Sequence, residues 1–162
     1  MLIPYNYRFD EVKQVFVFNT DNDVTYEIEI NQVGETYFPE SLSLHRICYE
    51  ICLNYCESLK TKQDERICLT VIKIVKSLLL KGYILLFICD SLDKKQKGRH
   101  RLFNQWFTKY GDQFEKSDIE VEDDESLYSL SWMLNPKQRD ILHIQNIFQD
   151  SINEHIVCKN NT

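Results

Sequence analysis

Apolar and polar residues alternate strictly along residues 24–30. The apolar positions are Val24, Tyr26, Ile28 and Ile30, and the positions between them are Thr25, Glu27 and Glu29. This period of two predicts a half-buried strand. Because residues 20–23 have turn chemistry, we expect residues 12–19 and 24–32 to form a hairpin. Residues 34–41 read as a loop.

Residues 44–57 (LHRICYEICLNYCE) can be interpreted in two ways. As a strand, they place Ile47, Tyr49, Ile51, Leu53 and Tyr55 on one face, and Arg46, Cys48, Glu50, Cys52, Asn54 and Cys56 on the other. This clean separation favours a strand, and a helix with a ridge of cysteines is the alternative. Cysteines four apart lie about 13 Å from each other on a strand, and the outer two lie about 12 Å apart on a helix. Neither geometry converges on one ion, so we expect no metal site.

A helix followed by a buried strand is predicted next. Thr61 and Asp64 resemble a capping box, and Gly82 fits just past the helix end. The apolar face is formed by Ile67, Val71, Ile74, Val75 and Leu78. The run YILLFIC at residues 83–89 is continuously apolar, as in a central strand that is covered on both faces.

The second half of the chain predicts a helix, a hairpin and a final helix. Ser91 is a candidate N-cap for a helix over residues 92–110, and the expected buried stripe is Leu102, Phe103, Trp106, Phe107 and Tyr110. Residues 128–134 alternate as the second strand of a hairpin. Asn135 and Pro136 then predict the start of a helix that runs to about His155. Residues 1–157 should form a single α+β domain, with a frayed tail at 158–162. The expected order is βββ-α-β-α-ββ-α, in one mixed, mostly antiparallel sheet with packed helices.

The basic run after the central strand contains the best candidate site. Lys94, Lys97 and Arg101 project away from the buried stripe, which is typical of a solvated helix face. Arg99 projects into the stripe, with Lys95 and Gln96 on the same side. One interpretation is a structural bridge between Arg99 and a carboxylate such as Asp90. The other is a polar binding pocket at the C-terminal end of the central strand, lined by Asp90, Asp93, Lys95, Gln96 and Arg99. His100 and Arg101 are not expected to converge with Arg99.

Charge and motifs narrow the classes of function. The net charge of −6 gives no reason to expect nucleic-acid binding, and it favours basic partners. No P-loop, GxGxxG, HExxH or GxSxG motif is present, so we expect no cofactor and lean against an enzyme. No signal peptide or membrane span is recognised, so the six cysteines should be reduced thiols in the cytoplasm. The acidic segment 112–125 is either a solvated hairpin or a patch for a basic partner.

The stretch ICDSLDKKQKGRHRLFNQWF at residues 88–107 resembles the signature of a family of small Bacteroidetes proteins, domain of unknown function 6169. That signature is a strand ending in CDS-x-D, then Gly-Arg, then R-x-R-L-F-x-x-W-F. The matching residues are Cys89, Asp90, Ser91, Asp93, Arg99, Arg101, Leu102, Phe103, Trp106 and Phe107. Lys94 and Lys95 stand in place of the Gly-Arg pair. The resemblance implies a bacterial origin and assigns no activity. From the missing catalytic motifs and the acidic segment 112–125, the leading hypothesis is a non-catalytic protein-binding accessory, immunity- or antitoxin-like. The alternative is a small-molecule or nucleic-acid-binding domain, enzymatic or not, that uses the predicted pocket.

Overall fold

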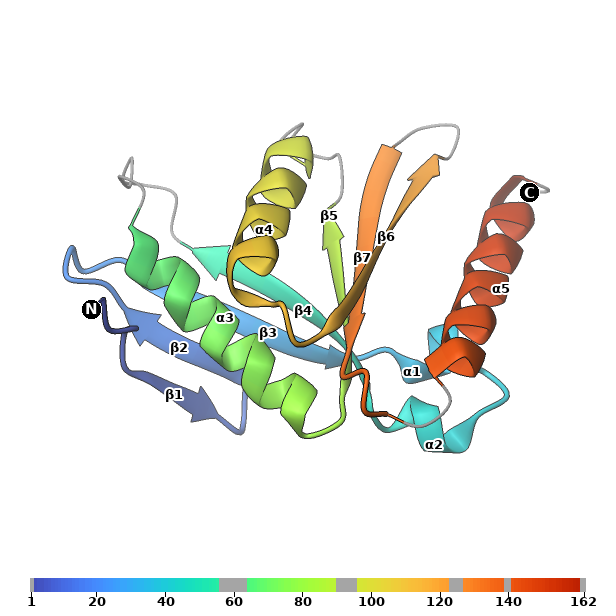
Figure 1. Ribbon diagram of the computed structural model, residues 1–162, viewed down its shortest axis with the longest axis horizontal. Coiled ribbons are helices and arrows are strands. Elements are labelled where there is room, and N and C mark those ends of the chain that lie inside the picture. Colours follow the sequence, from blue (N-terminus) through green and yellow to red (C-terminus); the bar gives the residue numbers. More distant parts are fainter. Residues whose placement is uncertain (1, 56–63, 90–95, 123–126, 139–140, 161–162) are drawn as a thin grey trace.

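Seven strands form one mixed sheet in the computed structural model, which describes residues 2–55, 64–89, 96–122, 127–138 and 141–160 (Figure 1). The sheet order is β1-β2-β3-β4-β5-β7-β6. Only β4 and β5 pair in parallel, and every other neighbouring pair is antiparallel. The strands are β1 (Tyr7–Asp10), β2 (Val15–Asn19), β3 (Thr25–Gln32), β4 (Cys48–Tyr55), β5 (Ile84–Cys89), β6 (Glu115–Glu122) and β7 (Leu127–Leu134).

Helices of very different length lie on the two faces of this sheet. They are α1 (Gly34–Tyr37), α2 (Leu42–His45), α3 (Glu65–Leu80), α4 (Gln96–Tyr110) and α5 (Ile141–Asn160). The predicted α+β class with a mixed, mostly antiparallel sheet is confirmed. None of the described helices combines the length and the apolarity that a helix needs to cross a membrane.

The first half of the chain agrees with the predicted strands and adds short elements. Residues 44–57 contain a strand, β4, and not a helix. The expected hairpin is present as β2 and β3, with Phe18 opposite Tyr26. It begins only at Val15, because residues 11–14 form a turn in which Gln14 has a φ of 55°. The four-residue strand β1 and the one-turn helices α1 and α2 were not predicted, because each is too short to show a period.

Two separate hydrophobic cores flank the sheet. On one face, α3 and α4 pack on a core that includes Phe18, Ile28, Ile51, Leu85 and Met133. On the other face, α5 and the α1 region pack on Cys48, Ile84, Leu86, Leu130 and Trp132. The central strand β5 therefore contributes alternate residues to both cores, as its continuous apolar sequence predicted. In Figure 1, α5 lies at one end of the molecule, far from β1 and β2.

The start of α3 differs from the predicted capping box. Asp64 is itself the N-cap, and its side chain accepts a hydrogen bond from the Arg66 amide at 2.9 Å. Thr61 lies outside the described residues. The predicted C-terminal glycine is confirmed, since Gly82 has a φ of +84° directly after the helix end.

The start of α5 was also predicted incorrectly. Asn135 and Pro136 belong to a turn, in which the Asn135 carbonyl accepts from the Gln138 amide at 2.9 Å. The side-chain oxygen of Asn135 accepts from the Lys137 amide at 3.0 Å, so this residue caps the turn instead of the helix. The helix α5 spans Ile141–Asn160 and thus continues past the expected end near His155. Ile144, Phe148 and Ile152 are buried on the side of this helix that faces the sheet.

The buried stripe of α4 is narrower than predicted. Phe103 is buried and stacks on Phe87 of β5 with ring centroids 4.3 Å apart. Trp106 and Phe107 are partly buried against the same core. Leu102 is 37% exposed, because the residue before Phe103 on a helix points about 100° away from it. The predicted first residues of this helix lie outside the described part of the chain.

Candidate functional site

The predicted pocket lies largely beyond the described residues. Asp90, Asp93 and Lys95 all fall within the segment 90–95, which is not described. Gln96 is the first residue of α4, and only its backbone is described. Arg99 is half-buried on the first turn and has at least one interaction partner. Lys97 and Arg101 are exposed, as predicted. The pocket around Arg99 therefore stays a prediction.

Just after Arg99, α4 contacts the β6–β7 hairpin at the edge of the sheet. Five polar side chains meet there and are called the α4–β6 polar cluster: His100 and Asn104 of α4, Lys116 and Asp118 of β6, and Ser131 of β7. Asp118 is at its centre. Its Oδ1 accepts a hydrogen bond from Ser131 Oγ at 2.6 Å and lies 3.4 Å from His100 Nε2. Its Oδ2 accepts from Asn104 Nδ2 at 3.4 Å, and Lys116 forms an ion pair with it.

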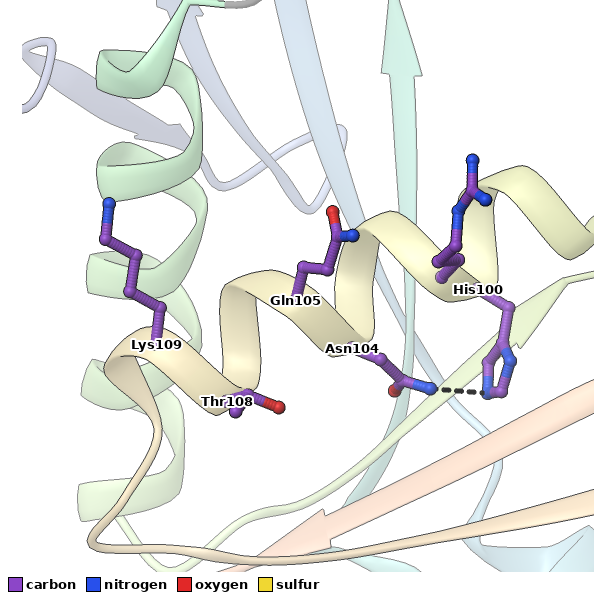
Figure 2. A pocket seen from close by; sticks show the side chains of 6 residues that line it. His100, Asn104, Gln105, Thr108 and Lys109 are labelled. Atoms are coloured by element: carbon purple, nitrogen blue, oxygen red, sulfur yellow. Dashed lines mark hydrogen bonds between the residues drawn. The ribbon is translucent and has the colours of Figure 1, made fainter.

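Simple periodicities bring these five residues together. Lys116 and Asp118 are two apart on β6, so their side chains share one face of the sheet. Asp118 is the cross-strand partner of Ser131 on β7. His100 and Asn104 are four apart on α4 and share one side of the helix. Figure 2 shows both of them reaching from α4 toward the β6–β7 side. The sequence analysis missed this cluster because it took the segment 112–125 as a solvated hairpin or a partner patch.

The cluster keeps Asp118 ionised. Burial by itself would raise the pKa of Asp118, but hydrogen bonds from Lys116 and Ser131 outweigh that effect and hold the pKa below its usual value. The charge of Asp118 in turn balances Lys116, whose side chain is only 9% exposed. A buried ammonium without a partner would be costly, so this pair is needed for the stability of the hairpin.

Serine, histidine and aspartate occur together here without forming a nucleophilic relay. In such a relay the serine donates its proton to histidine, and the aspartate orients the histidine from its other side. Ser131 instead donates to Asp118, and it is completely buried. The cluster therefore does not activate Ser131 as a nucleophile.

A shallow hollow of about 480 Å³ runs along the outer side of α4 and is called here the α4 hollow. Two adjacent rows of side chains with a spacing of four residues line it: Arg101, Gln105 and Lys109 in one row, and His100, Asn104 and Thr108 in the other (Figure 2). Arg99 is not among the lining residues. His100 and Arg101 both line the hollow, without Arg99, so the structure does not bring the three residues together there.

The far end of α4 is tied to the beginning of α3. Lys109 forms an ion pair with Glu65, and the Tyr110 hydroxyl donates to the same carboxylate at 2.7 Å. These contacts raise the pKa of Lys109 and lower the pKa of Glu65. The charge of Lys109 is thus already matched within the chain.

A second polar surface lies on the opposite face of the sheet. Glu27 and Glu29 of β3 and Glu50 of β4 point away from the α3 side, because their strand neighbours Ile28 and Ile51 are in the α3 core. We call these three residues the acidic sheet face. All three are half-buried. Asn54 donates to Glu29 at 2.8 Å, and the Cys52 thiol donates to Glu50 at 3.6 Å.

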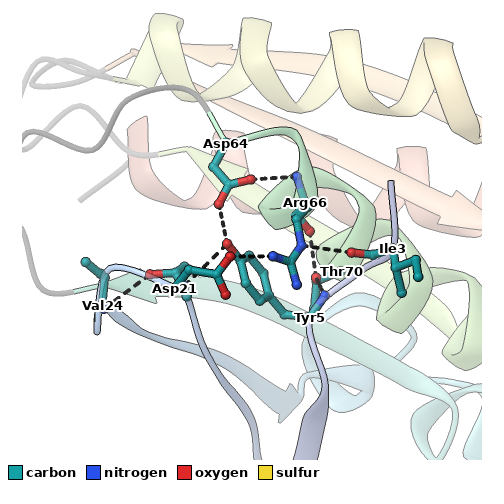
Figure 3. Close-up of polar contacts among 8 residues, drawn as sticks. Ile3, Tyr5, Asp21, Val24, Asp64, Arg66 and Thr70 are labelled. Atoms are coloured by element: carbon teal, nitrogen blue, oxygen red, sulfur yellow. Dashed lines mark hydrogen bonds and ion pairs between the residues drawn. The ribbon is translucent and has the colours of Figure 1, made fainter. Parts of the chain in front are cut away.

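A third polar network holds the N-terminal segment and has a structural role. Tyr5 donates through its hydroxyl to Asp64 at 2.5 Å, and its amide donates to Thr70 Oγ1 at 2.8 Å. Arg66 lies over the Tyr5 ring at 3.9 Å and pairs with Asp21 at 2.5 Å (Figure 3). The network joins the N-terminal segment, the β2–β3 turn and the first turn of α3.

Cysteine and metal chemistry find little support in the part of the chain that the structure describes. Cys48 and Cys68 are buried free thiols, and burial raises the pKa of each to about 12. Such thiols are poor nucleophiles and poor ligands at neutral pH. No three His, Cys, Asp or Glu side chains among the described residues are grouped closely enough to hold an ion.

A mixed seven-stranded sheet with helices on both faces defines an α+β protein. Its main polar surfaces lie on α4 and on the acidic sheet face of β3 and β4. Residues 63–150, more than half of the chain, match the model of a family of unknown function, DUF6169. The chain belongs to this family, and the resemblance of residues 88–107 is confirmed. The matched region contains all of α4, β6 and β7 and therefore the whole α4–β6 polar cluster. No curated protein matches the chain.

Proposed function

We propose that this chain is a non-catalytic accessory protein that binds a basic protein partner through the acidic sheet face. As in immunity proteins and antitoxins, the binding itself would be the function. We place it in the bacterial cytoplasm, in keeping with the free thiols Cys48 and Cys68. The observation that carries the proposal is that Glu27, Glu29 and Glu50 share a sheet face and that none of them forms an ion pair with a described lysine or arginine.

The lack of cover supports a docking role for this face. The residues in the core that contains α5 come from β4, β5, β6, β7 and the segment around α1 and α2, and none of them lies within β1, β2 or β3. Over the described part of the chain, no helix packs against the second face of β2 and β3. The centre of that face is a set of neighbouring cross-strand pairs, including Glu27 with Asn54 and Glu29 with Cys52.

The electrostatic balance supports a basic partner. No described lysine or arginine forms an ion pair with Glu27, Glu29 or Glu50. Like charges on neighbouring positions of a sheet face destabilise the fold by a few tenths of a kcal/mol or more. A partner that brings lysine or arginine side chains would relieve this repulsion. Complementary charge would also speed its association with the acidic sheet face.

The acidic sheet face is a better candidate than the acidic segment 112–125 that the sequence suggested. Asp118, at the middle of that segment, is engaged by the α4–β6 polar cluster. Glu115 and Glu120 are exposed on β6, which is an edge strand. Charged side chains on an edge strand are a common protection against aggregation, so they need no partner to explain them.

Charge reversal tests the proposal. A tagged chain is captured from its native host, and the bound proteins are identified and compared with those bound by a Glu27→Lys/Glu29→Lys variant. The matched control is Glu154→Lys, which reverses an exposed carboxylate on α5. We expect one basic protein to be lost from the double variant and kept by the control. If the double variant retains every partner of the wild type, the acidic sheet face is not the binding surface.

A further inference from the structure

We propose that the α4 hollow binds the phosphate groups of a small phosphorylated molecule, with Arg101 as the anchoring cation. This ligand would be distinct from the basic protein partner, because the hollow lies on the α3 side of the sheet and carries the opposite charge. The inference does not depend on the proposed function of the acidic sheet face.

Arg101 is the cation in the hollow that is free to take a ligand. It is exposed, and it makes no hydrogen bond or ion pair with another described residue. Lys109 lines the same hollow but is paired with Glu65, and His100 is in contact with Asp118. A guanidinium presents several N–H donors in a plane and binds phosphate oxygens in pairs.

Two neutral side chains extend this site along the helix. Gln105 lies one turn after Arg101 in the same row, and Thr108 lies in the adjacent row. Both are exposed, and neither makes a side-chain hydrogen bond within the described residues. At 1.5 Å of rise per residue, Arg101 and Thr108 are about 10 Å apart along the axis. Their side chains can therefore hold a diphosphate-sized group between them.

Among the described residues, no unpaired carboxylate lines the hollow or contacts its lining side chains. None of its lining residues is acidic. The two carboxylates that contact lining residues are both neutralised, Asp118 by Lys116 and Glu65 by Lys109. Because both carboxylates are paired with a lysine, the hollow is compatible with added negative charge.

The number of donors favours phosphate over carboxylate. Arg101, Gln105 and Thr108 together offer more N–H and O–H groups than the roughly four acceptor positions of one carboxylate. A diphosphate carries more acceptor oxygens and a higher charge. The volume of about 480 Å³ is also larger than a lone inorganic ion requires, and it falls within the range of small-molecule sites.

Calorimetric titration of the full chain tests this assignment. The probes are pyrophosphate and adenosine diphosphate, with citrate as a carboxylate of comparable charge. The variants are Arg101→Ala in the hollow and Lys97→Ala as a matched control, since Lys97 is exposed one turn earlier in the same row but does not line the hollow. Circular dichroism melting of each variant reports whether it remains folded.

We expect pyrophosphate to bind the wild type with a dissociation constant of about 1 mM or tighter. Arg101→Ala should weaken this binding about tenfold, because it removes charge-assisted hydrogen bonds, whereas Lys97→Ala should change it less than about twofold. Equal losses in the two variants would mean general attraction to a basic helix and would overturn the site. Citrate binding as tightly as pyrophosphate would overturn the choice of phosphate. No measurable binding of either phosphate probe at 10-fold the expected constant would overturn the proposal as a whole.

Discussion

Nε2 of His100 lies 3.4 Å from Oδ1 of Asp118, and this contact joins α4 to the outer hairpin of the sheet. Asp118 also accepts from Ser131 across the β6–β7 pair. One carboxylate thus connects a helix and two strands, and it belongs to the part of the chain that matches the family model. Its removal should have larger effects than the removal of other acidic residues on β6.

Replacing Asp118 should destabilise the protein in a pH-dependent way. The pKa of Asp118 is lowered in the folded state, so its ionised form contributes stability that is present above its unfolded pKa. That stability is lost as the pH falls through the lower, folded pKa. Asp118→Ala should lower the free energy of unfolding at pH 7 by about 1–3 kcal/mol, because Lys116 loses its partner. The gap to wild type should narrow at acidic pH.

Urea denaturation at pH 7 and at a series of lower pH values measures this effect. Glu120→Ala is the matched control, since Glu120 is an exposed carboxylate on the same strand. It should stay within about 0.5 kcal/mol of wild type. A constant difference between Asp118→Ala and wild type down to the lowest pH would contradict the assigned role of the ionised carboxylate.

The N-terminal network predicts different effects for two neighbouring tyrosines. Tyr5→Phe keeps the ring contacts with Arg66 and Phe18 but loses the hydroxyl bond to Asp64. We expect a loss of about 1 kcal/mol in the free energy of unfolding. In Tyr7→Phe the lost hydroxyl has no hydrogen-bond partner among the described residues, so the change should stay below about 0.5 kcal/mol. Equal effects in a chemical denaturation series would argue against this network.

Two glycines should respond in opposite directions to alanine. At Gly34 a Cβ would lie 2.2 Å from the backbone carbonyl oxygen of His45, so Gly34→Ala should cost at least about 2 kcal/mol. At Gly98, within α4, nothing lies within 4 Å of an added Cβ. Gly98→Ala should therefore stabilise the protein by up to about 1 kcal/mol through helix propensity. Thermal melting of both variants checks these signs, and a destabilised Gly98→Ala would show that the helix is not regular there.

Thiol reactivity should separate three cysteines. Burial raises the pKa of Cys48 and Cys68 to about 12, so both are almost entirely protonated at neutral pH. Cys52 is half-buried beside the acidic sheet face. Iodoacetamide should modify Cys52 before the other two, as measured by peptide mass mapping, and the three rates should converge in guanidinium. Modification of Cys48 at the rate of Cys52 in the folded protein would contradict the assigned burial.

Periodicity alone predicted the sheet class, the strand β4 and the central strand β5, because these elements have long and regular patterns. The prediction of helix starts was wrong where one capping residue is compatible with two local structures. Asn135 can cap a helix or a turn, and in this chain it caps a turn. Asp64 can occupy position N3 of a capping box that begins at Thr61, or it can be the N-cap itself, and in this chain it is the N-cap.

The candidate surfaces were harder to predict for a different reason. The position of Asp118 beside Ser131 depends on the register of β6 with β7, and its contact with His100 depends on the rotation of α4 above them. Neither the strand register nor the rotation of the helix can be predicted from a local sequence pattern. The alternation of residues 24–30 does put Glu27 and Glu29 on one face. The length and position of α5 then decide that no described helix packs there.

The most direct test of the acidic sheet face is to map the contact of the captured partner by NMR. The isotope-labelled chain is titrated with the purified partner, and the amide shifts are followed. We predict that the largest changes fall on β2, β3 and β4, around Glu27 and Glu29, and that they disappear in Glu27→Gln/Glu29→Gln while Glu154→Gln behaves as wild type. Changes centred on α4 or on the edge strand β6, with the acidic sheet face unaffected, would contradict the account.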